Sequence, residues 1–425
     1  MGLATASVRL AQGPQVILRR MPSSELLLHL PKTDLHVHLD GSLRLPTLIE
    51  LARTRGVALP SETEEGLNAL VFKPQYSSLE EYLTGFGLTC AVLQDAEALE
   101  QAAYELAWDN LDEHVYYVEP RFAPQLHMRP GFGYAEVLRA VNRGLARAQA
   151  EHNQSEAVRA GQLPGFHYGI IVCAMRMFTP EFSTWFARLF DTLSESPQEQ
   201  LHAAAALELA RASVRARDEL GLPIVAFDLA GHEAGFPAMR YNDAFRYAHA
   251  HFLKKTVHAG EAYGPESIYQ AISTLNADRI GHGFHLFSPE LIRDAEVLDR
   301  DRYVRDLAEF IADRRVTLEV CITSNLQTNP TIGAAQNHTF RKMLDAGLSA
   351  TLCTDNRLVS HTTVTRELEL AVRTFKMTDK EIRNTLIYGF KRSFFPGTYL
   401  EKRAWVRSII NHYDAVLARY APPAG

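Results

Sequence analysis

The chain has 425 residues, of which 46% are hydrophobic and 22% charged, and its formal net charge at pH 7 is −6. This composition is typical of a globular protein, and the length allows two or three domains or one large α/β barrel. No basic run could follow a phosphate backbone, and no apolar stretch reaches the about 18 residues of a membrane-spanning helix, so we expect neither nucleic acid nor a membrane as a partner.

The cysteines and the N-terminal residues indicate the cellular compartment. The four cysteines are Cys90, Cys173, Cys321 and Cys353. They form no C-x-x-C pair and are too few for a disulfide scaffold, which predicts a cytoplasmic protein. Residues 1–24 contain no acidic residue and no apolar run of signal-sequence length, so we interpret them as a loosely ordered extension. Residues 25–425 are expected to form a single domain, and no pattern indicates the oligomeric state.

Short β-branched runs bounded by glycine, proline or charged residues predict about eight strands. In chain order they are residues 33–39, 115–124, 166–176, 223–231, 255–261, 279–286, 316–325 and 349–356. Helical spacing of apolar residues predicts helices at residues 45–56, 135–152, 199–221, 265–275, 305–315 and 338–347. Alternating strands and helices predict a (β/α)₈ TIM-type barrel with extra helices and helical insertions. An open doubly wound sheet is the alternative, but the Gly-rich phosphate turn that usually follows its first strand is absent.

The first predicted strand contains the segment DLHVHLDGS, residues 34–42, in which His36 and His38 alternate with apolar residues. Alternate residues of a strand face the same side, so both imidazoles point to one face while leucine and valine pack behind them. Two buried structural histidines with backbone partners would give the same short pattern. Residues elsewhere in the chain are therefore needed to distinguish a structural pair of histidines from a functional one.

Other chemically active residues also fall near the ends of predicted strands. His258 and Glu261 end the fifth strand, His282 lies in the sixth, and Asp355 is near the end of the eighth. The carboxyl ends of the strands of an α/β barrel meet at one mouth, so we expect these side chains to gather there. Three imidazoles and a carboxylate suit one Zn²⁺ per chain, or another divalent transition metal. The predicted ligands are His36, His38, His258 and Asp355.

The predicted site has the groups that hydrolysis needs. A cation of this kind lowers the pKa of its water to about 7, which makes hydroxide available as a nucleophile. His282 would hold or deprotonate this water, and Asp355 could share the task. Glu261 in HAGE is not part of the H-E-x-x-H helix of metalloproteases, and an apolar pocket would make it a general acid. Singly, HAGE, RIGHG and TDN are more often structural, and only their position on separate strand ends indicates a site.

These motifs resemble those of the adenosine deaminase family of metal-dependent amidohydrolases. The resemblance runs in order through DLHVHLDGS, EPRFAP, CAMR, DLAG, HAGE, RIGHG, TSN and TDN, over roughly residues 30–365. H-x-H is common among amidohydrolases, whereas HAGE followed by GHG, SN and TD is specific. The H-x-E and P-C-x-x-C motifs of the other zinc deaminases are absent. No basic cluster lies beside the motifs to bind the phosphate of AMP.

The resemblance implies hydrolytic deamination of a 6-aminopurine nucleoside, adenosine or 2′-deoxyadenosine, to inosine or 2′-deoxyinosine and ammonia. In this reaction Glu261 would protonate purine N1 as hydroxide attacks C6. His282 and Asp355 would orient the hydroxide. The alternatives are deamination of free adenine or of a 5′-modified adenosine, and, from another class, a purine-binding or signalling barrel without turnover.

The resemblance also implies the residues that bind the substrate. The Gly231 amide would donate to N3, and Asp40 would bind a ribose hydroxyl. The run LEEYLTGF would form a lid helix with Tyr82 and Phe86 over the pocket, although a core-facing helix has the same pattern. Asn356 stands where the family usually has a second aspartate, facing N7. Since N7 is an acceptor and an amide NH₂ is a donor, a purine still fits.

Overall fold

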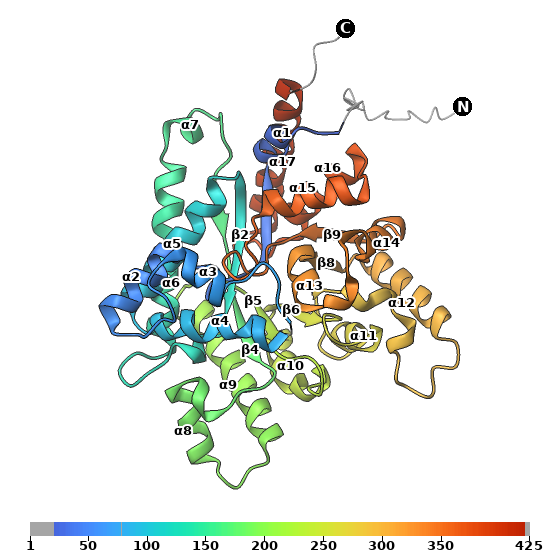
Figure 1. Cartoon of the computed structure of the whole chain (residues 1–425). Helices are drawn as coiled ribbons and strands as arrows, with labels where there is room; N and C mark the ends of the chain where they lie inside the picture. The colour runs from blue at the N-terminus through green and yellow to red at the C-terminus, as the bar shows by residue number, and fades with distance from the viewer. Residues whose placement is uncertain (1–20, 78, 421–425) are drawn as a thin grey trace, which may run out of the picture.

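The computed structural model describes residues 21–77 and 79–420, and parallel strands form its centre (Figure 1). Neighbouring strands follow the order β1-β2-β4-β5-β6-β7-β8-β9, and the short strand β3 pairs with β2 beside this path. The strands are β1 Lys32–His38, β2 Val115–Phe122, β3 His167–Tyr168, β4 Ile170–Met175, β5 Ile224–Ala230, β6 Lys254–Ala259, β7 Arg279–His282, β8 Thr317–Val320 and β9 Ser349–Leu352. This arrangement confirms the predicted (β/α)₈ TIM-type barrel.

The barrel closes where β1 meets the segment that follows β9. Val37 and Asp355 form a parallel bridge at this point. The His38 amide donates to the Asp355 carbonyl at 2.7 Å, and the Asp355 amide donates to the His36 carbonyl at 2.8 Å. Three of the predicted metal ligands are therefore joined by the backbone hydrogen bonds that complete the barrel.

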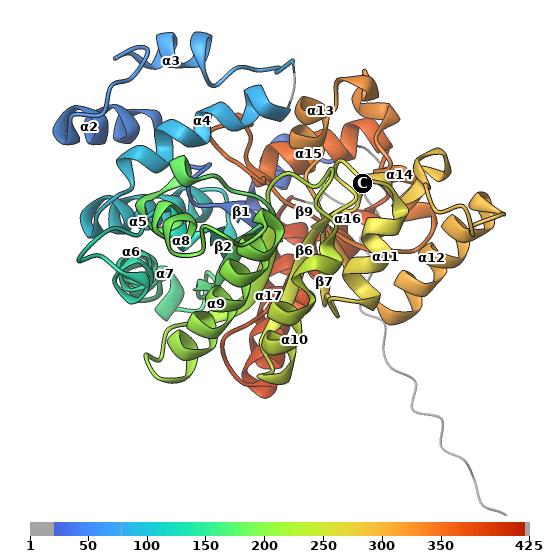
Figure 2. The same ribbon diagram turned by 90° about the horizontal axis from the view of Figure 1, so that it is seen from below.

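Helices surround the strands (Figure 2). They are α1 Ser24–His29, α2 Leu45–Arg55, α3 Glu64–Leu70, α4 Leu79–Val92, α5 Ala96–Leu111, α6 Tyr134–Asn153, α7 Glu156–Arg159, α8 Thr184–Thr192, α9 Gln198–Asp218, α10 Asn242–Ala250, α11 Pro265–Ser273, α12 Arg300–Arg314, α13 Ile322–Thr328, α14 Phe340–Asp345, α15 Val364–Phe375, α16 Asp379–Arg392 and α17 Tyr399–Tyr420. Helix α9 packs against β4 and β5, and α16 packs against β1 and β9. Helix α4, inserted between β1 and β2, contacts both α2 and α13, so this segment reaches the helix that follows β8.

The predicted strands are present, and the differences from prediction are local. Gly169 interrupts the third predicted strand, which forms β3 and β4. The sixth ends at His282 and continues as the 3₁₀ turn Phe284–Phe287, and the seventh ends at Val320 before helix α13. Both extensions are short, and periodicity alone does not separate a strand from a helix over so few residues.

The first described helix begins close to the predicted domain boundary. The Ser23 side chain caps α1 by accepting a hydrogen bond from the Leu26 amide. Helix α1 packs against α15 and α17. Residues 1–20 of the predicted extension lie outside the described residues, so the division into an extension and a single domain stays a prediction. Within residues 21–77 and 79–420, no helix combines the length and apolar character needed to cross a membrane.

Charged side chains lie inside the barrel. Arg121 on β2 lies 3.1 Å from Asp228 on β5 and 2.8 Å from Glu319 on β8, and all three side chains are fully buried. Arg279 on β7 donates to Glu319 at 2.6 Å and also to Glu119. Buried charges are tolerated when they are paired and hydrogen-bonded. Two of these carboxylates also contact histidines of the predicted metal site, which connects the network to that site.

Candidate metal centre and active site

The four predicted metal ligands converge at the carboxyl ends of the strands. His36 and His38 lie on β1, His258 lies on β6, and Asp355 follows β9. One ligand atom of each lies within 4.8 Å of those of the others. The Nε2 atoms of His38 and His258 are 3.2 Å apart. Asp355 Oδ1 lies 3.3 Å from His36 Nε2 and 3.5 Å from His38 Nε2.

Two buried carboxylates orient the histidines. Glu319 Oε2 lies 2.9 Å from His36 Nδ1, and Asp228 Oδ2 lies 3.1 Å from His258 Nδ1. Because a carboxylate only accepts, each Nδ1 carries a proton and donates it, and each Nε2 turns towards the centre. Sequence reasoning missed both carboxylates. Asp228 in DLAG stood in a recognised motif, whereas Glu319 lies on β8, whose residues belong to none of the recognised motifs.

Burial and the surrounding charges shift the pKa values of these groups. Burial opposes the ionisation of Glu319, but Arg121 and Arg279 outweigh it and hold the pKa of this carboxyl well below its ordinary value. Burial, followed by the charge of Arg121, lowers the pKa of His36 to about 4, so its imidazole is neutral near pH 7. At His258, burial lowers the pKa, but Asp228 outweighs it and raises the pKa above the ordinary value.

These residues fit a divalent cation. His36 Nε2 is buried and has no hydrogen-bond partner among the described residues. It faces the Asp355 carboxylate, and a lone pair beside an anionic oxygen is stabilised by a positive charge between them. Tetrahedral ligands about 2.0–2.1 Å from an ion lie roughly 3.3 Å apart. The separations of 3.2, 3.3 and 3.5 Å between the ligand atoms of this centre agree with that value.

A chain of hydrogen bonds determines which nitrogen of His282 faces the centre. The Phe340 amide donates to His338 Nδ1 at 3.0 Å. Burial lowers the pKa of His338 to about 3, so the neutral ring carries its proton on Nε2, which donates to Asn325 Oδ1 at 3.1 Å. The Asn325 NH₂ group in turn donates to His282 Nδ1 at 3.1 Å. Neutral His282 therefore carries its proton on Nε2, 3.7 Å from Glu261 Oε2.

The backbone is strained at two residues of the centre. His282 has φ 62° and Asp355 has φ 61°, in the left-handed region that favours glycine. Asp355 is also held through its side chain, because Oδ2 accepts from the Ser324 hydroxyl at 2.6 Å. Non-glycine residues in this region concentrate at functional sites, where the surrounding structure constrains them.

Glu261 lies on a loop that a second glutamate organises. Glu233, which is only 3% exposed, accepts hydrogen bonds at 2.8–3.0 Å from the backbone amides of residues 260–263. Burial raises the pKa of Glu261; His282 partly opposes this shift and Asp355 adds to it. The loop thus holds a carboxyl group of raised pKa beside His282. Sequence reasoning missed Glu233, although an acidic residue two positions after Gly231 was a visible signal.

Helix α4 brings Tyr82 and Phe86 to the centre. Asn356 Nδ2 donates to the Tyr82 hydroxyl at 2.6 Å, and this hydroxyl pairs with Ser360 Oγ at 2.9 Å. The ring centroids of Phe86 and His38 are 6.3 Å apart, with the ring planes perpendicular. Three of the predicted substrate residues therefore lie together on the α4 side of the metal ligands.

Asp40 and Gly231 occupy different sides of the centre. Asp40 follows His38 by two residues and is buried. The chain passes Asn356 so closely here that a Cβ on Gly41 would lie 1.9 Å from Asn356 Oδ1, so a side chain at this position would displace the Asn356 amide. Gly231 follows β5 with φ 91°, and a Cβ there would lie 3.7 Å from the amide nitrogen of Arg176. The Arg176 guanidinium donates to the His258 carbonyl at 2.7 Å, which links this side to the metal ligands.

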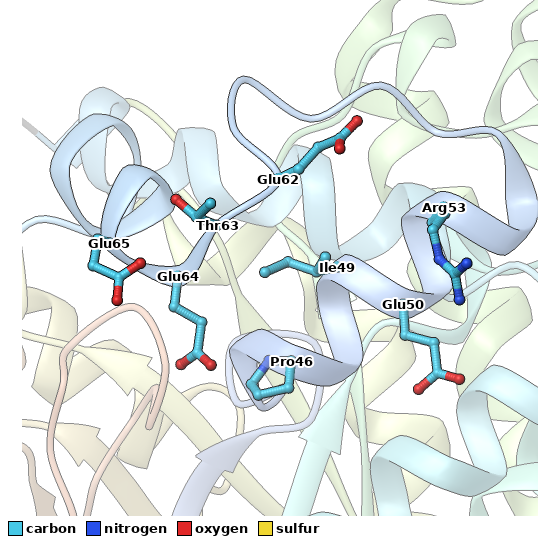
Figure 3. A pocket seen from close by; sticks show the side chains of 8 residues that line it. All are labelled: Pro46, Ile49, Glu50, Arg53, Glu62, Thr63, Glu64 and Glu65. Atoms are coloured by element: carbon cyan, nitrogen blue, oxygen red, sulfur yellow. The ribbon is translucent and has the colours of Figure 1, made fainter.

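A surface hollow lies away from these residues, between α2 and α3 (Figure 3). Its volume is about 530 Å³. The residues that line it are Pro46, Ile49, Glu50, Arg53, Glu62, Thr63, Glu64 and Glu65. None of them belongs to the predicted site, so the chemistry lies at the strand ends and not in this hollow.

This (β/α)₈ barrel gathers three histidines and a carboxylate at its strand ends, which is the ligand set of a metal-dependent hydrolase. The family model described as adenosine deaminase matches residues 31–411. "Adenosine deaminase" of Mycobacterium ulcerans is 36% identical over 401 residues, covering 93% of this chain and 99% of the relative. "Adenosine deaminase 1" of Streptomyces coelicolor is 34% identical over 394 residues, covering 92% of this chain and 89% of the relative.

Solved structures share the fold. An amidohydrolase from Burkholderia ambifaria with bound zinc has a TM-score of 0.72 at 20% identity and covers 93% of this chain and 94% of its own. An adenine deaminase from Arthrobacter aurescens has a TM-score of 0.67 at 20% identity and covers 90% of this chain and 98% of its own. The chain belongs to the adenosine deaminase family, and it is a metal-dependent aminohydrolase.

Proposed function

We propose that this enzyme hydrolyses the 6-amino group of adenosine and 2′-deoxyadenosine, with one Zn²⁺ per chain as its cofactor. The observation that carries the proposal is the convergence of His36, His38, His258 and Asp355 within 4.8 Å, beside a glutamate of raised pKa. The names of the relatives at 34–36% identity support adenosine as the substrate. The donor set of three imidazoles and one carboxylate supports zinc, although other divalent transition metals suit it as well.

The proposed reaction replaces the C6–N bond of the purine by a C6–O bond. The proton of the attacking oxygen passes to the 6-amino group, which leaves as ammonia. Zinc in this position supplies Lewis acidity, which makes hydroxide available near pH 7. Glu261 donates a proton to N1, which makes C6 more electrophilic. His282 donates a hydrogen bond from Nε2 to the attacking oxygen, and the Asp355 carboxylate accepts one from it. The two residues thereby hold this oxygen in line with C6.

The remaining predicted residues would bind the substrate. The Gly231 amide donates to purine N3, and the Asn356 NH₂ group, which has two protons, donates one of them to N7. Asp40 accepts from a sugar hydroxyl. Tyr82 and Phe86 on α4 cover the pocket and exclude water.

Two alternatives stay open within this proposal. Free adenine or a 5′-modified adenosine would use the same chemistry, and Asp40 argues against a 5′-phosphate because like charges repel. A binding barrel without turnover would have no need of a proton donor such as Glu261 beside the ligands. The cytoplasm is the proposed location, since the four cysteines are all free and three of them are buried.

The test is ammonia release by zinc-loaded enzyme with adenosine, 2′-deoxyadenosine, adenine, AMP and a 5′-modified adenosine offered separately. We expect the two nucleosides to react with the highest kcat/KM. The matched control is Glu261→Gln, which keeps the size of the side chain but removes the acidic proton. It should lower kcat by about 10²–10⁴-fold.

Elemental analysis of both proteins accompanies the assay. Glu261→Gln should retain as much zinc as the parent, because Glu261 is not one of the proposed ligands. A variant that reacts as fast as the parent would disprove the role of Glu261. Preference for adenine or the 5′-modified nucleoside would change the assigned substrate and keep the reaction. Inactivity of the zinc-loaded parent on the whole panel would disprove the proposed function.

A further inference from the structure

His127 is a buried histidine with one unused nitrogen. It follows the 3₁₀ turn Pro124–Leu126 after β2 and is fully buried. Its Nδ1 lies 2.9 Å from the Leu93 carbonyl, which can only accept, so Nδ1 carries the proton. Burial lowers the pKa of His127 to about 4, so the ring is neutral and Nε2 presents a lone pair. Among the described residues this Nε2 has no hydrogen-bond partner.

The lone pair of His127 faces Asp40. Its Nε2 lies 3.9 Å from Asp40 Oδ2, and Asp40 Oδ1 is also buried without a partner in the described part of the chain. The Cys90 thiol approaches Oδ2 only at 3.9 Å, the outer limit of a weak sulfur hydrogen bond. Burial raises the pKa of Asp40 to about 7. In its ionised form the carboxyl leaves two acceptors side by side with unfilled hydrogen-bonding capacity. A buried arrangement of this kind is unfavourable until donors enter it.

The cluster of Asp40, Cys90 and His127 adjoins the proposed substrate pocket. Asp40 lies two residues beyond His38, and Cys90 lies one helical turn beyond Phe86 on α4. A ligand that reaches the metal ligands beneath α4 can therefore extend to this cluster. The groups it must carry there are hydrogen-bond donors, and one hydroxyl can give its proton to only one of the two acceptors.

We propose that His127 Nε2 and the Asp40 carboxylate form a two-acceptor site for two hydroxyls of the nucleoside sugar. This inference rests on the proposed function and deepens it. Asp40 takes one hydroxyl and His127 takes a second, so His127 is a specificity-determining residue. A sugar that lacks the second hydroxyl leaves His127 unpaired in the closed pocket, which costs affinity in the transition state.

A second metal ion is the competing explanation, because ligand atoms of Asp40, Cys90 and His127 lie within 4.8 Å of one another. Thiolate, not thiol, is the form of cysteine that binds metals. Burial raises the pKa of the Cys90 thiol well above its ordinary value, and Asp40 adds to this effect. Without a cation the thiol therefore keeps its proton, and the zinc content of the parent and of His127→Leu distinguishes the two explanations.

The test compares adenosine with its 2′-deoxy, 3′-deoxy and 5′-deoxy analogues on the parent and on His127→Leu and His127→Gln. Leucine removes the acceptor, whereas glutamine keeps an acceptor oxygen. On the parent, we expect 2′-deoxyadenosine to react like adenosine. Of the 3′-deoxy and 5′-deoxy analogues, the one that lacks the hydroxyl bound by His127 should show a fall in kcat/KM of about tenfold or more. His127→Leu should lower kcat/KM for adenosine by a similar factor and barely change it for that analogue. His127→Gln should restore part of the preference.

The outcomes separate the explanations. An equal loss on all four nucleosides in His127→Leu would mean a purely structural role and overturn the inference. A second equivalent of zinc in the parent that is absent from His127→Leu would show that this cluster binds a metal, and would overturn the inference of a sugar site. If the parent deaminates none of the four, the proposed function fails. The inference about His127 is then tested by calorimetric titration, which measures the affinities of the parent and of His127→Leu for the same nucleosides. Equal affinities of parent and His127→Leu for all four would then overturn it.

Discussion

Glu261 is the residue whose protonation state bears most directly on the proposed reaction. Its pKa is raised chiefly by burial, above the value of about 4.3 of an exposed glutamate. Because a donor must carry its proton, the contribution of Glu261 to kcat/KM is present below its pKa and is lost as the pH rises through it. The measurement is the pH dependence of kcat/KM for adenosine on zinc-loaded enzyme. A value that keeps rising with pH would contradict the role of Glu261 as the acid.

Asn325 is the residue that determines the tautomer of His282. Asn325→Asp replaces the NH₂ donor by a carboxylate oxygen, so the proton of His282 should move to Nδ1 and leave a lone pair on Nε2. We expect kcat to fall about 10–100-fold, as for other partners that orient a site histidine. Nitrogen NMR of histidine-labelled enzyme measures the tautomer directly. A His282 that keeps its proton on Nε2 in this variant would refute the hydrogen-bond chain.

At the scale of an element, the loop between β6 and α11 depends on Glu233. Glu233→Gln turns one acceptor oxygen into a donor that faces the amides of residues 260–263. Leaving such buried amides without a partner costs about 1–3 kcal/mol of folding free energy. Displacement of Glu261 should also lower kcat by about tenfold or more.

Urea unfolding and kcat measure the two effects of Glu233→Gln. Glu309→Gln is the matched control, since Glu309 is exposed on α12. It should leave both quantities within error of the parent. A Glu233 variant that behaves like this control would show that the loop holds Glu261 without the carboxylate.

The elements themselves were largely predictable, and the exceptions have a common cause. The predicted seventh strand, residues 316–325, ends at Val320 because the chain turns into helix α13 at the barrel mouth. That turn brings Ser324 to Asp355 and Asn325 to His282. A run of this length is compatible with either structure, and the contacts at the mouth determine which one forms.

At the scale of the whole molecule, the buried charges inside the barrel connect folding to the metal centre. Arg121→Met removes the cation between Asp228 and Glu319 and leaves both carboxylates less compensated. We expect a loss of about 3–5 kcal/mol in the free energy of unfolding, as for other broken buried ion pairs. Zinc retention should also weaken, because these carboxylates orient His36 and His258.

Urea unfolding and elemental analysis test the Arg121 variant. Arg302→Met on α12 is the control, because Arg302 pairs with Asp306 on the surface, where both side chains are largely exposed. Exposed pairs contribute about 0–1 kcal/mol, so this change should have little effect on either quantity. An Arg121 variant no less stable than the control would disprove the role of the network.

The sequence by itself determined the barrel and the set of candidate ligands. Each of His36, His258 and Asp355 lies near the end of a strand that its own neighbours in sequence identify, and a parallel barrel brings all such ends to one mouth. Only the tertiary structure decided which groups orient them. His36 and Glu319 are 283 positions apart, and Asp40 meets His127 from a different strand. Such pairs depend on the register and stagger of the closed barrel, which arise from the packing of the whole chain and leave no local pattern.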